Sequence, residues 1–269
     1  MRIGVVGHVE WVEFLRIPRV PKPGAIVQST ERWEEPGGGG GVSAGVLKRL
    51  AGEATLFTVL GDDNLGHRAL DELERLGIRV EAVFRPEPQR RAVVFIDEDH
   101  ERTITLVGEK LRPRIDEDLP WDELSEFDAL YYTAGMPEVI QAARKAKVVV
   151  ATARELEYLK PAHVRLDALV SSESDPAETY AGELDPQPEL VVRTRGFEGG
   201  SYDPGHGDWE PAAVQGPIVD AYGAGDSFAA GLTYGLGSGL SVDDALVTAA
   251  HCGAEALLRR GAHGATPAA

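Results

Sequence analysis

The chain has 269 residues, of which 43% are hydrophobic and 26% are charged. These proportions are those of a globular protein and exclude wholesale disorder, a collagen-like fibre and a coiled coil. The 27 Lys and Arg residues against 44 Asp and Glu give a net charge of −17, which disfavours binding to nucleic acid or to an anionic membrane surface. The length favours a single domain over residues 1–269.

Cysteine usage and the apolar runs bear on the compartment. The single cysteine, Cys252, excludes an intrachain disulfide and a cysteine-built metal site, and we interpret it as a small buried hydrophobe. The apolar run that ends at Gly7 is too short for a signal peptide. No stretch reaches the roughly 18 apolar residues that span a bilayer. We therefore expect a cytoplasmic protein with no membrane partner.

Strands and helices alternate along most of the chain, which predicts a doubly wound, mostly parallel α/β sheet with helices on both faces. Two polar, β-rich segments, residues 8–35 and 80–108, are expected to form a small sheet that stands off the main one as a lid. The expected strands are 3–6, 54–60, 92–96, 103–107, 129–133, 148–151, 168–171 and 190–193, followed by a hairpin-like stretch over 199–213. The expected helices are 42–50, 65–76, 137–146, 225–236 and 242–258, with a short one beginning at Pro176.

The first glycine cluster occupies residues 37–41. Residues 39–44, Gly-Gly-Gly-Val-Ser-Ala, formally match the dinucleotide fingerprint, but the segment before them is polar where that fingerprint follows a buried strand. The cluster is otherwise either a structural loop or a loop whose missing side chains let a ligand approach the backbone at a helix N-terminus. We favour the last interpretation.

The second cluster, residues 220–228, reads Asp-Ala-Tyr-Gly-Ala-Gly-Asp-Ser-Phe. The backbone N–H groups of Gly223, Ala224 and Gly225 can point into one concavity, and the helix that begins there adds its positive dipole end. Asp226 is either a capping acid or the base that takes a proton from a hydroxyl under phosphorylation. The sequence contains no Gly-x-x-x-x-Gly-Lys-Ser/Thr loop, which excludes a P-loop ATPase.

Together these motifs resemble the ribokinase family of carbohydrate and nucleoside kinases, also called the PfkB family. Residues 220–228 resemble its C-terminal signature, Asp-Thr-x-Gly-Ala-Gly-Asp, and residues 38–41 resemble its N-terminal glycine signature. The resemblance covers nearly the whole chain. It implies a doubly wound domain with a β lid that transfers phosphate from ATP, with Mg²⁺ as bridging metal, to a hydroxyl of a small sugar or nucleoside. Further likenesses lie at residues 21–24, 61–66, 194–200 and 259–262.

The resemblance also implies roles for individual residues. Asp226 would be the catalytic base, with Gly223, Ala224 and Gly225 as the anion hole. Many members bind a monovalent cation near this loop, which makes K⁺ a further expectation. The residues implied at the nucleotide are Thr194, Gly196, Gly199, Asp220 and His251, although His251 taken alone is equally typical of a packed helix histidine. The residues implied at the acceptor are Gly38, Gly39, Ser43, Val12, Glu10 and Arg90.

Several positions depart from the family pattern. Ala221 replaces the signature Thr, Val12 stands where the family has a sugar-binding Asp, and Ser43 replaces an Asn. The Asn-x-x-Glu motif near Mg²⁺ becomes Ser172-Glu-Ser-Asp175, which leaves Asp175 as the candidate magnesium ligand. The catalytic side is therefore intact, whereas ordinary ribose recognition is in question because a pocket for hydroxyls depends on polar partners.

Three arginines, Arg90, Arg91 and Arg102, flank the expected lid strands. They either hold a phosphate or carboxylate of the acceptor or are surface charges paired with the acids at 98, 99 and 101 across the hairpin. The expected function is thus an ATP-dependent kinase of a small sugar or nucleoside. The alternatives are a kinase of a phosphorylated or acidic sugar, a non-catalytic nucleotide-binding regulator on the same fold, and, more remotely, a dinucleotide oxidoreductase. A lid of this kind also suggests a homodimer.

Overall fold

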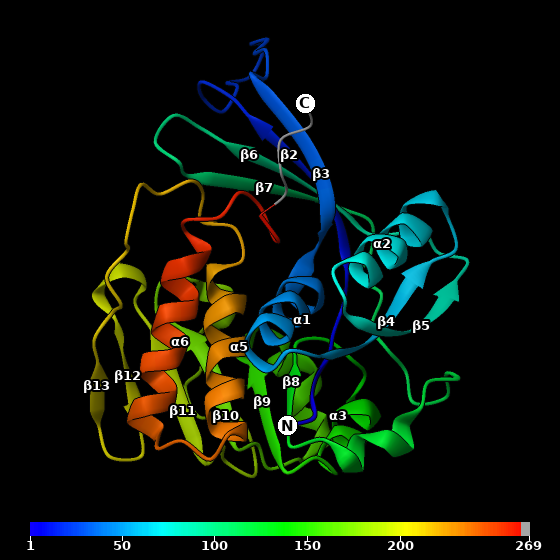
Figure 1. Ribbon diagram of the computed structural model, residues 1–269, viewed down its shortest axis with the longest axis vertical. Coiled ribbons are helices and arrows are strands. Elements are labelled where there is room, and N and C mark those ends of the chain that lie inside the picture. Colours follow the sequence, from blue (N-terminus) through cyan, green and yellow to red (C-terminus); the bar gives the residue numbers. More distant parts are fainter. Residues whose placement is uncertain (265–269) are drawn as a thin grey trace.

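Short runs of apolar and β-branched residues form the buried strands of a nine-stranded sheet in the computed structural model, which describes residues 1–264. The strand order is β13-β12-β11-β10-β9-β8-β1-β4-β5, and every neighbouring pair is parallel except β11–β12 and β12–β13 (Figure 1). Since parallel strands need both faces covered, these strands read as continuous apolar runs. The strands are β1 (Ile3–Val6), β4 (Thr55–Gly61), β5 (Arg79–Arg85), β8 (Ala129–Tyr132), β9 (Val148–Thr152), β10 (Ala168–Ser172), β11 (Leu190–Thr194), β12 (Gly200–Asp203) and β13 (Gly207–Trp209).

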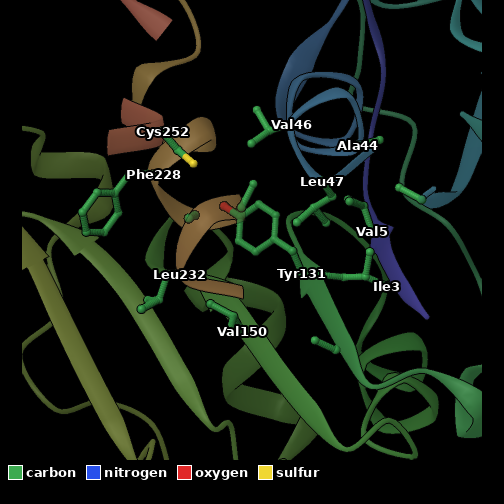
Figure 2. Close-up of a cluster of buried hydrophobic side chains, with 14 of the residues drawn as sticks. Ile3, Val5, Ala44, Val46, Leu47, Tyr131, Val150, Phe228, Leu232 and Cys252 are labelled. Carbon is green, nitrogen blue, oxygen red and sulfur yellow. The ribbon is translucent and has the colours of Figure 1, made fainter. Parts of the chain in front are cut away.

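Helices cover both faces of this sheet, which confirms the predicted fold class. One buried cluster joins the sheet to helices α1, α2, α5 and α6, and a second joins its other face to α3 and α4. Figure 2 shows Tyr131 at the centre of the first cluster, with Leu47 and Val46 of α1 on one side and Leu232 and Phe228 of α5 on the other. The helices are α1 (Gly38–Ala51), α2 (Asn64–Arg75), α3 (Pro137–Ala143), α4 (Leu156–Leu159), α5 (Ala224–Gly237) and α6 (Val242–Ala256).

A four-stranded sheet, in the order β3-β2-β6-β7, stands above the carboxyl ends of the main strands as a lid (Figure 1). Alternate side chains of its strands form a separate small core with Tyr222. The edge strand β7 is exposed along its whole length, and its Ile104 and Leu106 pair with buried Val94 and Ala92 of β6. The expected homodimer through the lid stays a prediction, and this apolar edge is the surface it would cover. The lid strands are β2 (Glu10–Arg16), β3 (Glu31–Gly37), β6 (Arg91–Ile96) and β7 (Arg102–Val107).

The expected lid segment, residues 80–108, wrongly includes a strand of the large sheet. Arg79–Arg85 forms β5, which pairs in parallel with β4 and is the edge strand of the large sheet. An edge strand is only half covered, so its mixed polar pattern resembled that of the lid strands. Four glycines, Gly38–Gly41, belong to α1, which begins at Gly38 rather than at Val42.

Cys252 is buried, and burial raises the pKa of its thiol to about 11, which agrees with its interpretation as a small hydrophobe. Among residues 1–264 no helix has the length and apolar character needed to cross a bilayer.

Candidate active site

The N-terminus of α5 is the candidate anion site, and its polar groups are backbone N–H groups. Gly223 precedes the helix with φ +72°, a left-handed conformation, and an added Cβ there would lie 2.9 Å from a methyl carbon of Val42. No side chain caps this helix end, and Ala224 and Gly225 both line a cavity. The free N–H groups of the first turn and the helix dipole together favour a bound anion here.

Asp226 lies in the same turn, with its carboxylate beside the start of α1. A Cβ on Gly39 would lie 2.2 Å from Oγ1 of Thr133 and 3.1 Å from Oδ1 of Asp226, so a side chain there would crowd the carboxylate. Burial raises the pKa of Asp226 to about 6 and the charge of Glu178 adds to this, whereas Arg154 and Arg102 oppose it. A carboxylate with a pKa near 6 is mostly ionised at neutral pH and is basic enough to accept a proton from a reacting hydroxyl.

A cavity of about 280 Å³ opens next to the anion site, between α5, α6 and the ends of β10 and β11. Thr194 and Gly196, two of the residues expected at the nucleotide, line it. Phe197 also lines it and is 68% exposed, which leaves an aromatic face free for a planar ligand. The remaining lining residues are Arg102, Ser172, Ser174, Trp209, Pro211, Ala212, Val214, Ala221, Ala224, Gly225, Phe228, Ala250, Gly253, Ala254 and Leu257.

Two other residues expected at the nucleotide do not line this cavity. His251 is exposed on α6, because the face of the helix turned to the cavity carries Ala250, Gly253 and Ala254. Gly199 is needed for packing, since an added Cβ would lie 2.2 Å from the carbonyl oxygen of Trp209.

Asp220 is fully buried and has a structural role in this fold. Its Oδ1 accepts the N–H of Tyr222 at 2.9 Å, and its Oδ2 accepts the N–H of Gly261 at 2.8 Å. Glu35 of the lid strand β3 binds the next residue, accepting the N–H of Ala262 at 2.9 Å. The turn after α6 is thus fastened both to the anion-site loop and to the base of the lid.

The residues expected at the acceptor divide into two groups. Gly38 and Gly39 lie between the lid and Asp226, and a Cβ on Gly38 would touch the backbone and Cγ of Glu10. Glu10 is buried, and its Oε1 lies 2.8 Å from Nε of Arg90 and 3.5 Å from Nε2 of His8. These residues form one polar group at the root of the lid.

Val12 and Ser43 are wrong as acceptor ligands. Val12 is fully buried in the lid core with Phe14 and Trp33. Ser43 is fully buried between two helices, where its hydroxyl donates to the backbone carbonyl of Asp226 at 3.3 Å. Both side chains therefore pack against protein atoms and have no surface left for a ligand.

Sequence reasoning missed several charged residues that join this polar group. Glu155 is fully buried and binds both Lys110, at 2.6 Å, and Arg112, at 3.3 Å. Burial lowers the pKa of His8, and the charge of Lys110 lowers it further. These residues come from separate segments with no shared spacing, so no sequence motif announced them. We call His8, Glu10, Arg90, Lys110, Arg112 and Glu155 the acceptor-side cluster.

The lid arginines are not paired across the β6–β7 hairpin as one interpretation expected. Arg90 binds Glu10, and Arg102 donates to the backbone carbonyl of Ala221 in the loop before the anion site. Arg91 is exposed at the start of β6. The hairpin instead stabilises its own turn, in which Asp97 accepts two backbone N–H groups.

A magnesium ion that arrives with a nucleotide would have to displace Arg154 from Oδ2 of Asp175, whose Oδ1 accepts the N–H of Ala177 at 2.9 Å. Mg²⁺ keeps several waters and is held by one or two carboxylates together with substrate phosphates. Ser172 lines the cavity, and Asp175 follows three residues later in the chain. The N–H of Ala177 and the charge of Arg154 lower the pKa of the Asp175 carboxyl, so this carboxylate is ionised. Arg154 lies 2.6 Å from Asp175 and also binds Glu178. Residues 1–264 contain no group of three or more metal-ligating side chains that would form a resident site.

The contacts of the anion-site loop do not fit the expected monovalent cation. The Asp220 oxygens accept two backbone N–H groups, and the Ala221 carbonyl accepts from Arg102. The Val219 carbonyl oxygen lies 3.0 Å from Nδ1 of His100. A cation needs several oxygens that point at one free position, and here protein donors occupy them.

Comparison with known proteins identifies the family of the chain. The family model for the pfkB family carbohydrate kinases matches residues 2–269. An ATP-dependent ribose-1-phosphate kinase of Halopiger xanaduensis is 29% identical over 294 residues, covering 100% of this chain and 96% of that protein. A ribokinase of Lactococcus lactis is 25% identical and covers 99% and 94% of the two chains.

Solved structures show the same fold. The ribokinase of Thermotoga maritima superposes with a TM-score of 0.79 at 22% identity, over 100% of this chain and 96% of that one. The ribokinase of Cryptococcus neoformans in complex with ADP superposes with a TM-score of 0.75 at 23% identity, over 97% and 95%. With a family match along almost its whole length and this fold, the chain belongs to the pfkB family of carbohydrate kinases.

Proposed function

We propose that this protein transfers the γ-phosphoryl group of ATP to a hydroxyl of a small sugar or nucleoside. The observation that carries the proposal is the arrangement at the start of α5. There the Asp226 carboxylate stands one residue beyond the free N–H groups of Ala224 and Gly225, between the cavity on one side and the acceptor-side cluster on the other. A base beside an anion hole is what the phosphorylation of a hydroxyl requires.

The cavity supports a nucleotide as donor. Its apolar wall of Ala250, Gly253 and Leu257 and the exposed face of Phe197 suit an adenine ring. The N–H groups at the start of α5 suit the phosphates, so a chain with a net charge of −17 needs no basic surface to bind ATP. The ribokinase of Arabidopsis thaliana, solved with ribose and ATP, has the same fold with a TM-score of 0.73 at 22% identity.

The residues would divide the reaction between them. Asp226 accepts the proton of the acceptor hydroxyl as the hydroxyl oxygen bonds to the γ-phosphorus. The bond from that phosphorus to the β–γ bridging oxygen breaks, and its electron pair leaves with ADP. The N–H groups of Ala224 and Gly225 hold the charge on the transferring group. Asp175 and Ser172 would hold Mg²⁺, which supplies positive charge to the phosphates when bound.

A second candidate, favoured by the acceptor-side cluster, is a kinase whose sugar already carries a phosphate or carboxylate. Three cations, Arg90, Lys110 and Arg112, face two carboxylates, Glu10 and Glu155, which leaves an excess of positive charge at the root of the lid. Arginine binds phosphate and carboxylate groups in bidentate fashion. The ribose-1-phosphate kinase of Halopiger xanaduensis, matched over the whole chain, acts on such a substrate by its name.

An ADP-release screen tests both candidates. The panel comprises ribose, ribose 1-phosphate, fructose 6-phosphate, gluconate and adenosine, each with MgATP. Turnover with any of them, and loss of at least about 10²-fold of that turnover in Asp226→Asn with ATP affinity unchanged, would support the proposed kinase. A preference for ribose 1-phosphate over ribose would support the second candidate. ATP binding without turnover on the panel would favour a non-catalytic regulator, and an Asp226→Asn variant that keeps its turnover would refute the assigned base.

A further inference from the structure

The turn between β6 and β7 reaches from the lid to the loop that precedes the anion site. Nδ1 of His100 lies 3.0 Å from the carbonyl oxygen of Val219, and the Arg102 guanidinium donates to the carbonyl of Ala221. Asp97 holds the turn in shape, since its Oδ1 accepts two backbone N–H groups at 3.0 and 3.1 Å. A lid arginine, Arg102, therefore contacts the loop that leads into α5.

Arg102 faces the nucleotide cavity rather than the acceptor-side cluster. It lines the cavity together with Gly225, Ser172 and Thr194. The loop it contacts leads, three residues after Ala221, into the N–H groups proposed to bind phosphate. The guanidinium is thus close to where the terminal phosphates of a nucleotide would lie, and it is exposed and able to turn toward them.

The charge of Arg102 also reaches the acids around that position. It opposes the burial and the Glu178 charge that together raise the pKa of Asp226. It adds to the stronger effects of the Ala177 N–H and Arg154 that lower the pKa of Asp175. Asp226 and Asp175 are the proposed base and the proposed magnesium ligand, so the position they flank is that of the transferring phosphoryl group.

We propose that Arg102 is a catalytic residue supplied by the lid, whose guanidinium contacts the γ-phosphoryl group of the bound nucleotide. This inference rests on the proposed kinase function. Negative charge is spread over the equatorial oxygens of the phosphoryl group during transfer, and a guanidinium presents several donors to such oxygens. Since Arg102 belongs to β7, the contact forms only when the lid is over the site, and transfer is coupled to lid position.

Binding measurements that need no acceptor test the contact first. Calorimetry compares the affinity of Mg²⁺ with the non-hydrolysable triphosphate AMP-PNP against the affinity for ADP. In the wild type the γ-phosphate contributes part of the affinity, and Arg102→Ala should reduce that contribution about 10-fold while ADP binding changes little. Arg102→Lys should keep part of it, because the charge remains without the fork of donors. Arg91→Ala is the matched control, since Arg91 is exposed on the same lid.

Turnover with the best acceptor of the screen tests the catalytic role. Arg102→Ala should lower kcat about 10²- to 10³-fold with the acceptor KM nearly unchanged, Arg102→Lys should recover part of the rate, and Arg91→Ala should match the wild type. Equal weakening of AMP-PNP and ADP binding would show a merely structural role and overturn the proposal, as would a variant with wild-type kcat. The proposed function itself would be contradicted by an Asp226→Asn variant that stays active. If Asp226→Asn loses its activity while Arg102→Ala keeps full activity, only the proposed role of Arg102 is overturned.

Discussion

The two halves of the site are built from different materials. At the proposed nucleotide half the groups that would bind an anion are backbone N–H groups of one helix turn, set by Gly223 and Gly225 within a single short motif. At the proposed acceptor half the polar groups are charged side chains that pair with one another under the lid, as Glu10 does with Arg90 and Glu155 with Lys110. A backbone site tolerates no change of local geometry, whereas a side-chain site can be rewritten residue by residue. We infer that a fold divided in this way can keep one phosphate donor while its acceptor site varies.

The largest expected effect tests the backbone half. Gly223→Ala forces a side chain into a left-handed conformation and against Val42, 2.9 Å away, and should lower kcat at least about 10²-fold by displacing the anion site. Gly239→Ala is the control, because Gly239 has a similar φ of +76° with open space around it. It should cost about 1–2 kcal/mol in the free energy of unfolding and leave kcat unchanged. Equal effects of both variants on kcat would mean that the conformation of Gly223 is not specific to catalysis.

A smaller effect is expected in the side-chain half. Arg90→Met leaves the buried Glu10 carboxylate without its 2.8 Å partner and should raise the acceptor KM about 10- to 100-fold while kcat and the ATP KM change little. Arg90→Met combined with Glu10→Gln should recover part of the loss, since the unpaired charge is removed. KM values for ribose 1-phosphate and ribose, measured beside the exposed-site variant Arg91→Met, provide the readout. An unchanged acceptor KM in Arg90→Met would remove the acceptor-side cluster from the binding site.

The same difference determines what could be predicted from the sequence. The alternation of apolar runs predicted the doubly wound sheet, and the motif at 220–228 predicted a helix that begins with uncapped N–H groups, because both depend on neighbours in the chain. The motif also misled in one respect, since Asp220 fastens the turn at Gly261 by its N–H instead of contacting the cavity.

Only Glu10 and Arg90 of the acceptor-side cluster were predicted from the sequence; His8, Lys110, Arg112 and Glu155 were not. Its members come from the end of β1, the lid and the segment after β9, which meet only in the folded chain. Alignment by position put Val12 and Ser43 at the acceptor, but Val12 faces the lid core and Ser43 packs between α1 and α5. Glu10, the first residue of β2, instead pairs with Arg90 at the root of the lid, while Val12 two residues further on is covered by the lid core.

The smallest expected effect concerns the charge of Asp226, the carboxylate that lies between the two halves of the site. Burial and then Glu178 raise the pKa of this carboxyl to about 6, so kcat/KM should fall as the pH drops through 6 and the base becomes protonated. Glu178→Gln removes a negative charge and also frees its partner Arg154, and both changes favour ionised Asp226. The acid limb should therefore move to lower pH, and at pH 5 the variant should retain a larger fraction of its pH 8 rate than the wild type, by about threefold for a shift of half a pH unit. Glu53→Gln, at an exposed position in the loop after α1, controls for titration of the substrates, which would affect both variants alike. An acid limb that coincides in all three proteins would assign the titration to a substrate and leave the shared charge at Asp226 without a role in the reaction rate.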